Sequence, residues 1–384
     1  MKRILIISLA LALLASGVFG QGKVLGTMAP KDARTMGMGG SFVAMSTGYQ
    51  SFYGNPAAFA DTKSELTVLS TTAWAYVKPT TDNIQKATSF GGMEQQEQIT
   101  ALSSLLTENG LGAGTSLGIG WVGKGLGIGF VNTADVYLKG KNLLGAKGEA
   151  NAESAVIVGV GLPLTLGPLK FQLGGDIRPH MRVTGNVYAS DLLGGMFQGG
   201  GETNFDPGEI ELDSGFGIAL DLGAKLDLGS LVSVGLAIRD IAPPLKLQTV
   251  AAKDIFGAMG GGDKGDEVSY SLLPNIVLGA SITPIPVGLR KLVDVNITAE
   301  LQDPVNLVVN KLSPFSLLHL GAEGKFLNGL LAARLGVNKG YVSLGAGIDL
   351  LFMDLNVALF TEELGKRPGD KPRTGIAAEI AFRF

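Results

Sequence analysis

Three basic side chains lie two residues apart in one row of a strand-like segment. Between residues 169 and 189, one parity carries Arg178, His180 and Arg182, and the opposite parity is apolar. A period of two places these sets on opposite faces of a strand. Such cations can bind a carboxylate or another anionic head group. They can also form ion pairs with the acidic residues of the next segment, Glu211, Asp213 and Asp221. The sequence leaves both interpretations open.

Two glycine-rich stretches match enzyme motifs but lack the surroundings that those motifs require. Residues 114–118 have the pattern of a nucleophile elbow, yet the segment continues as a strand instead of turning into a helix. Residues 118–123 match a dinucleotide-binding pattern that no helix follows. With two histidines and no cysteine, the chain offers little for a metal site. We therefore expect no enzymatic activity, no metal and no cofactor.

The composition indicates strands and turns in an apolar setting. Glycine accounts for 57 of 384 residues, about twice its usual share of roughly 7%. Charged residues make up only 17%, against a typical share of about 25%. The net charge of -3 disfavours a nucleic-acid partner.

The first twenty residues have the pattern of a secretory signal peptide. Lys2 and Arg3 precede an apolar run over 4–14, and small residues then lead to an expected cleavage after Gly20. The apolar run is shorter than the roughly 20 residues that a membrane-spanning helix needs. We therefore expect export of the chain that follows.

From about residue 64 onward, alternating segments are separated by turn residues, which predicts strands. Connections after the even-numbered segments are short, and those after the odd-numbered segments are mostly long. Short turns at one rim and long loops at the other are typical of an outer-membrane β-barrel. The fourteen predicted strands are 64–78, 115–123, 125–138, 152–163, 169–189, 209–226, 230–242, 274–286, 291–302, 315–326, 329–338, 340–350, 352–362 and 373–384.

The last strand ends in an aromatic residue. Phe382 and Phe384 share one parity with three smaller apolar side chains. This ending resembles the C-terminal signal that the barrel-assembly machinery of Gram-negative-type outer membranes recognises. We expect that machinery as a partner during biogenesis, and outer-membrane lipid as the surroundings of the barrel.

Residues 21–62 do not follow the barrel pattern. Residues 33–44 read Ala-Arg-Thr-Met-Gly-Met-Gly-Gly-Ser-Phe-Val-Ala, and residues 53–57 read Tyr-Gly-Asn-Pro-Ala. Asparagine followed by proline is a favourable helix start. These motifs resemble the FadL-like outer-membrane transport family and its relative PorV, including a spirochaete-associated branch. The resemblance implies a hatch that folds inward, carried by Gly37, Gly39, Gly40, Phe42, Asn55, Pro56 and Ala57.

Pro179 lies on the apolar parity inside a predicted strand, where proline cannot donate to the ladder. The resemblance implies a lateral opening there for an apolar ligand, although a plain β-bulge would explain this proline equally well.

Three long loops carry apolar residues. They could pack on one another as a lid, or line a hydrophobic capture groove above the lumen. The ligand-binding candidates among them are Ile99, Leu102, Leu105, Leu106, Phe197, Ile255 and Phe256.

The sequence thus predicts an all-β chain with a signal peptide over 1–20, a hatch over 21–62 and a fourteen-stranded antiparallel transmembrane β-barrel over 63–384. We expect an outer-membrane channel for passive uptake of hydrophobic or amphipathic small molecules such as long-chain fatty acids. The alternative is a PorV-like scaffold or carrier for exported proteins.

Overall fold

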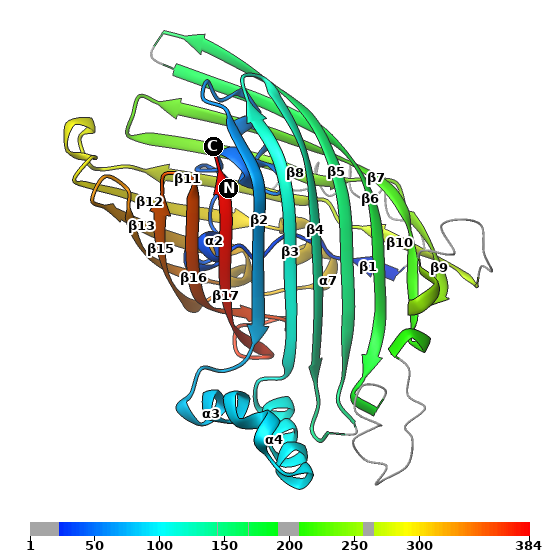
Figure 1. The fold of residues 1–384 in the computed structure, drawn as a ribbon. Coiled ribbons are helices and arrows are strands. Elements are labelled where there is room, and N and C mark those ends of the chain that lie inside the picture. The colour runs from blue at the N-terminus through cyan, green and yellow to red at the C-terminus, as the bar shows by residue number, and fades with distance from the viewer. Residues whose placement is uncertain (1–22, 144, 168, 191–206, 256–264) are drawn as a thin grey trace.

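A closed antiparallel barrel forms the body of the chain (Figure 1). The computed structural model describes residues 23–143, 145–167, 169–190, 207–255 and 265–384. Strands β2 to β8 and β11 to β17 make up the fourteen-stranded wall, which closes through the β17–β2 and β8–β11 ladders. This confirms the predicted fold. The wall strands are β2 Glu65–Tyr76, β3 Leu111–Gly123, β4 Leu126–Lys139, β5 Lys147–Leu166, β6 Leu169–Tyr188, β7 Glu211–Leu228, β8 Val232–Ile241, β11 Asn275–Ile282, β12 Val293–Gln302, β13 Leu318–Phe326, β14 Leu331–Asn338, β15 Tyr341–Leu350, β16 Met353–Glu363 and β17 Pro372–Arg383.

Two further strands lie in a region that the sequence predicts to be a loop. They are β9 (Leu245–Ala251) and β10 (Glu267–Leu272), which pair with each other. Prolines at 243, 244 and 274 separate them from β8 and β11. Because proline donates no ladder hydrogen bond, its presence in a sequence indicates the end of a strand. The continuation of both strands is therefore not visible in the sequence. A short strand near the start, β1 (Lys23–Leu25), pairs in parallel with β10.

Helical segments lie inside the barrel and at its rims. The segment 26–62 contains three short ones, and we call residues 23–62 the hatch. None of the described helices is long and apolar enough to cross a membrane. The helices are α2 Ala33–Gly37, η1 Gly48–Phe52, η2 Pro56–Ala60, α3 Thr81–Ser89, η3 Phe90–Gly92, α4 Gln95–Glu108, η4 Pro207–Glu209, η5 Ala252–Asp254, η6 Val287–Leu289, α7 Pro304–Asn310 and η7 Pro314–Leu317.

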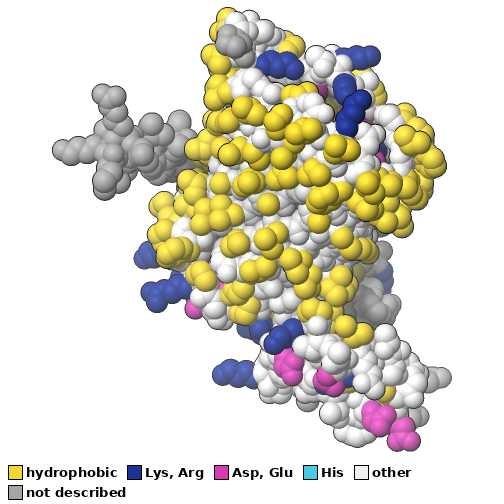
Figure 2. Space-filling view, turned by 90° about the vertical axis from the view of Figure 1, so that its left-hand side faces the viewer, with side chains coloured by type: hydrophobic (Ala, Val, Ile, Leu, Met, Phe, Trp, Pro, Cys, Tyr) yellow, Lys and Arg dark blue, Asp and Glu magenta, His cyan; other side chains and the backbone are white. Residues whose placement is uncertain are grey.

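The two faces of the wall differ in polarity as the alternation predicts. On β12, Ile297 and Leu301 are about half exposed, whereas Thr298 and Glu300 between them are buried. Hydrophobic side chains cover much of the outer surface (Figure 2). A closed barrel with this apolar exterior and polar interior spans an outer membrane.

The barrel seam joins the two ends of the wall. The backbone of Phe384 exchanges two hydrogen bonds with that of Leu66, at 2.9 and 2.8 Å. The Phe384 ring stacks on Phe352 with its centroid 6.4 Å away. Phe382 belongs to the outward parity, because its neighbours Ala381 and Arg383 point inward. The terminal aromatic residues therefore lie at the short-turn rim of the barrel.

Candidate functional site

The hatch lies against the inner wall at several wall glycines. A side chain on Gly174 would come within 2.1 Å of the Pro56 carbonyl oxygen, and one on Gly223 would come equally close to Asn55 Oδ1. Hatch glycines meet the wall in the same way. At Gly37 an added Cβ would lie 2.9 Å from the Gly345 Cα, and at Gly39 it would lie 2.6 Å from the Leu320 carbonyl oxygen. The glycines on both sides therefore allow backbone to rest on backbone.

Asn55 connects the turns of the hatch with the wall. Its Oδ1 accepts a hydrogen bond from the Ala57 amide at 3.0 Å, which caps the short helix η2. Its Nδ2 donates to the carbonyl oxygens of Val43 and Ala224, each at 3.1 Å. The predicted helix start at Asn55 and Pro56 is therefore present, as a 3-10 helix. Phe42 packs beside Tyr53, with ring centroids 5.9 Å apart.

The predicted basic row on β6 lies in a buried ion cluster. Arg178 contacts Glu153 at 2.7 Å and also pairs with Asp240 and Asp221. Arg182 contacts the second oxygen of Glu153 at 3.0 Å. Both guanidinium groups already have carboxylate partners, so this row forms the ion-paired interior that the sequence leaves as one of two interpretations.

His180 lies between the two arginines and is buried. Its Nδ1 is 3.1 Å from the Arg178 carbonyl oxygen, while its Nε2 has no hydrogen-bond partner among the described residues. The structure brings all three predicted residues together, although only Asp221 of the three predicted acidic partners joins them. Asp213 instead accepts hydrogen bonds from Tyr270 and Thr249, and Glu211 is exposed.

The same ion cluster holds the hatch. Arg182 donates to the Gly26 carbonyl oxygen at 3.3 Å, and Arg239 donates to that of Tyr53 while pairing with Asp221. Sequence reasoning missed Arg239 and its neighbour Asp240. Both lie at the end of β8, where Asp240 has a positive φ of 60° that breaks the alternation.

A second anchor joins α2 to β13. Arg34 makes two hydrogen bonds with Glu323, which also accepts from Arg334 at 2.8 Å. Burial alone would lower the pKa of Arg34, but attraction to the Glu323 carboxylate outweighs burial and raises that pKa. The hatch is thus fixed by charged contacts on two sides of the lumen.

At Pro179 the wall strands keep their register. The β6–β7 ladder runs through Pro179 opposite Ile218 without a shift of register. The β5–β6 ladder has no pairing opposite residues 178 and 179, but it resumes in the same register on either side. The strands therefore keep their register at Pro179, with a local loss of ladder pairing toward β5. The lateral opening stays a prediction.

β12 ends at Gln302, opposite Val277 of β11, and therefore does not extend alongside β10. Pro274 separates β10 from β11. The free edge of β10 carries β1 instead of a wall strand. Residues 23–25 therefore lie at this end of the wall, beside β10.

The apolar residues of the first long loop pack against the barrel. Leu102 and Leu106 of α4 are buried with Leu138 and Val187 of the wall, and Ile99 packs against the same cluster. Leu105 is also buried. These four predicted groove residues thus cover the long-loop rim and do not line an open groove. Phe197 and Phe256 lie outside the described residues.

An apolar hollow of about 640 Å³ lies on the outer face of the wall, near the long-loop rim. Its floor consists of small side chains on neighbouring strands, such as Ala113, Ala134 and Ala152. Met181 and Leu212 flank it, and the predicted groove residue Ile255 also lines it. The residues of the floor share the outward parity of Leu117 and Ile128, so this hollow faces the membrane and lies outside the lumen.

Solved structures with a similar fold include two toluene transporters and a FadL homologue. The toluene transporter TodX of Pseudomonas putida is 12% identical, with coverage of 95% of this chain and 99% of TodX and a TM-score of 0.48. The toluene transporter TbuX of Ralstonia pickettii is 11% identical over 94% and 98% of the two chains, with a TM-score of 0.49. A FadL homologue of Pseudomonas aeruginosa is 13% identical over 94% and 99%, with a TM-score of 0.46.

No protein-family model and no curated protein matches the chain. The three similar structures are 11–13% identical to the chain, with TM-scores below 0.5.

Proposed function

We propose that the protein is an outer-membrane channel for passive uptake of hydrophobic or amphipathic small molecules, such as long-chain fatty acids. The observation that carries the proposal is the hollow on the outer wall. Its volume of about 640 Å³ falls within the range of roughly 300–1,000 Å³ that small-molecule sites occupy. Small residues at Ala113, Ala134 and Ala152 leave this space.

The position of the hollow suits a ligand that dissolves in the membrane. It lies below the cluster that α4 forms with the rim, and it touches Val136 and Ala150, which belong to both. An apolar molecule there exchanges contact with lipid for contact with protein and keeps its apolar surface away from water. The wall strands stay paired at the hollow, so entry into the lumen requires a local opening of the wall. It also requires the hatch to move, because the hatch backbone occupies the interior at Gly174 and Gly223. No step of this route needs a covalent reaction.

Uptake of radiolabelled oleate and of toluene by cells that make the protein tests the proposal. Ala134→Phe fills the floor of the hollow and should lower uptake several-fold. The matched control is Ala378→Phe, since Ala378 faces outward on β17 away from the hollow. Uptake no higher than in cells without the protein would refute the channel. Equal uptake by both variants would refute the role of the hollow.

The scaffold function makes a different prediction. A scaffold for exported proteins should co-purify with them stably and give no uptake of either probe. Both results together would refute the channel function and support the scaffold function.

A further inference from the structure

The hollow on the outer wall contains a pair of polar side chains. Asn132 of β4 and Ser154 of β5 both line it. They lie directly opposite each other in the β4–β5 ladder, and Asn132 Nδ2 donates a hydrogen bond to Ser154 Oγ at 2.7 Å. Both have the outward parity, because the residues on either side of each are buried. The pair therefore faces the membrane.

This pair has hydrogen-bonding capacity that the protein does not use. An asparagine amide has two N–H donors and an acceptor oxygen, and a serine hydroxyl has one donor. Asn132 Oδ1 accepts from no described residue, and neither its second N–H nor the Ser154 O–H donates to one. The hydroxyl of Thr115 in the same hollow does have a partner, the Thr72 carbonyl oxygen at 3.1 Å. Lipid chains offer no hydrogen bonds, so unused polar groups on this face are costly.

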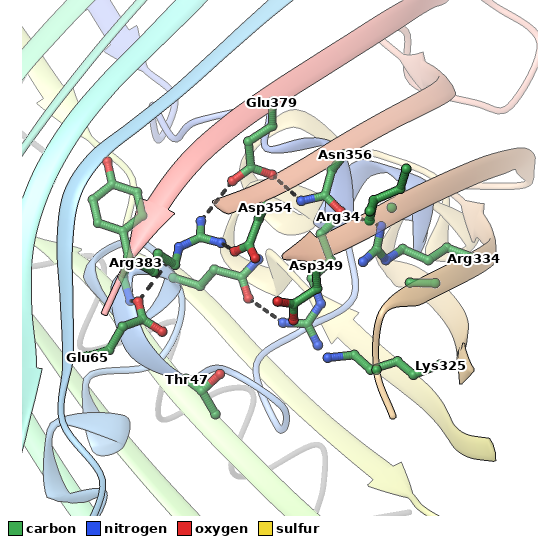
Figure 3. Close-up of a pocket in the computed structure, with 16 residues that line it drawn as sticks. Arg34, Thr47, Glu65, Lys325, Arg334, Asp349, Asp354, Asn356, Glu379 and Arg383 are labelled. Atoms are coloured by element: carbon green, nitrogen blue, oxygen red, sulfur yellow. Dashed lines mark hydrogen bonds and ion pairs between the residues drawn. The ribbon is translucent and has the colours of Figure 1, made fainter. Parts of the chain in front are cut away.

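A polar cavity inside the barrel shows the opposite situation (Figure 3). It has a volume of about 170 Å³ and lies between the hatch and strands β13 to β17. Its side chains bind one another: Arg383 contacts Glu379 at 2.9 Å, and Asn356 links Glu379 with Arg334 through hydrogen bonds of 3.2 and 2.8 Å. These groups use their polarity within the wall, whereas the pair in the outer hollow keeps free donors and a free acceptor.

Apolar side chains surround the pair on the outer face. The strand registers place one on each side along the row and two more in the rows above and below. These neighbours are Leu117, Phe130, Ala134, Ala152, Val156 and Met181. A ligand that reaches the pair therefore keeps the rest of its surface against apolar side chains.

The hollow provides no counter-ion for a charged ligand. Its described lining includes no lysine, arginine or histidine. The one carboxylate in the lining, Asp135, points into the lumen, where it accepts a hydrogen bond from Trp74 Nε1 at 2.7 Å. A charge that is buried without a partner is strongly unfavourable. The hollow therefore favours a neutral polar group.

We propose that Asn132 and Ser154 bind the hydroxyl group of a neutral amphiphile, such as a fatty alcohol. The hydroxyl donates to Asn132 Oδ1 and accepts from the Ser154 O–H, and the apolar part of the ligand lies over the alanine floor. A hydrocarbon leaves these groups without partners, and an ionised carboxylate has no proton to donate to Oδ1. A protonated carboxylic acid carries the same hydroxyl. This inference rests on the proposed uptake function, because it names the ligand class of the same hollow.

Flow dialysis of the full chain in detergent micelles tests the proposal. The probes are radiolabelled 1-dodecanol, dodecane and ionised laurate, with protein-free micelles as the blank. Asn132→Leu, a change to a side chain of similar size, should weaken dodecanol binding about fivefold or more and leave dodecane binding unchanged. Ser154→Ala should weaken dodecanol binding about twofold or more. Ionised laurate should bind more weakly than dodecanol.

Thr361→Val is the matched control. Thr361 and Thr374 form another hydroxyl pair on the outward face, with their Oγ1 atoms 3.0 Å apart, and neither lines the hollow. This change should leave dodecanol binding at the parent level. The heat-dependent gel shift of folded barrels verifies that each variant has folded.

Four outcomes would overturn the proposal. They are no dodecanol binding to the parent chain, laurate binding as tightly as dodecanol, dodecanol binding that neither substitution in the pair weakens, and an equal loss of dodecane binding in Asn132→Leu. Uptake by cells is a separate readout. Selective dodecanol binding without uptake of any probe would refute the channel and support the hydroxyl site.

Discussion

Arg34 of the hatch contacts both carboxylate oxygens of Glu323 on β13, each at 2.8 Å from a different guanidinium nitrogen. The Glu323 side chain is fully buried, and that of Arg34 is mostly so. This bidentate pair joins a segment near the start of the chain to a wall strand 289 residues later. It is the geometry in which arginine binds a carboxylate most strongly.

Breaking this pair should loosen the hatch. Arg34→Met leaves Glu323 with Arg334 alone and should lower the free energy of unfolding by about 3 kcal/mol, at the low end for buried ion pairs. Guanidinium unfolding in detergent micelles measures the loss. The exposed pair of Lys246 and Glu267, at 2.7 Å, provides a control in which Lys246→Met should cost less than about 1 kcal/mol.

A double-mutant cycle separates the pair from general damage. Arg34→Met combined with Glu323→Gln should cost less than the sum of the two single changes, by more than about 1 kcal/mol. Additive losses would mean that the two residues stabilise the barrel independently.

Adding one methyl group to the wall should displace the hatch. Gly223→Ala places a Cβ 2.1 Å from Asn55 Oδ1, so the cap of η2 has to shift. We expect a lower melting temperature, with a loss of about 1–3 kcal/mol that is typical of overpacking. Gly288→Ala is the control, because an added Cβ there meets no atom within 4 Å. Equal melting temperatures for both variants would contradict the close contact at Gly223.

Replacing the strand proline should not impair uptake. Pro179→Ala restores an amide donor next to β5, and a recovered ladder hydrogen bond is worth about 0.5–1.5 kcal/mol. Thermal unfolding should therefore show equal or higher stability, and oleate uptake should stay at the parent level. A marked fall in uptake with stability unchanged would show that Pro179 serves a passage after all.

The stability of the chain should depend on pH through Asp303, the residue between β12 and α7. Burial raises the pKa of Asp303. A carboxyl with a raised folded pKa favours the folded state at low pH, and this contribution is lost as the pH rises through the folded pKa. Asp303→Asn removes the ionisation, and asparagine suits the left-handed backbone at φ 61°.

The gain from Asp303→Asn should therefore be larger at pH 8 than at pH 4. Thermal unfolding of both proteins at the two pH values measures it. A gain of the same size at both pH values would exclude Asp303 as the titrating group.

The wall could be predicted from the sequence because alternation is a local signal. For β12, the predicted range of 291–302 differs from the observed Val293–Gln302 by two residues at one end. β9 and β10 were missed because the prolines at their inner ends resemble loop residues, while their pairing with each other depends on residues about 20 positions apart.

The partners of the basic row could be predicted only in part. The presence of Arg178 on the inner face follows from parity, but its contacts Glu153 and Asp240 lie 25 and 62 residues away. Contacts between inward side chains depend on the strand register and on the path of the hatch. Neither can be predicted from the sequence of a single strand. The outer hollow was missed for a related reason: alanines that look unremarkable in sequence create space only when neighbouring strands align them.

The position of the hatch in the chain has a consequence for biogenesis. The hatch precedes β2, and β2 forms the seam with the C-terminal strand β17. A segment that the ribosome makes before every wall strand is thus enclosed only when the last wall strand has paired. Until then the sheet is open along the edges of β2 and β17, and the hatch can take its place from the side. After the two hydrogen bonds between Leu66 and Phe384 form, a misplaced hatch would have to thread through a rim. We therefore expect the hatch to take its place before β17 pairs with β2.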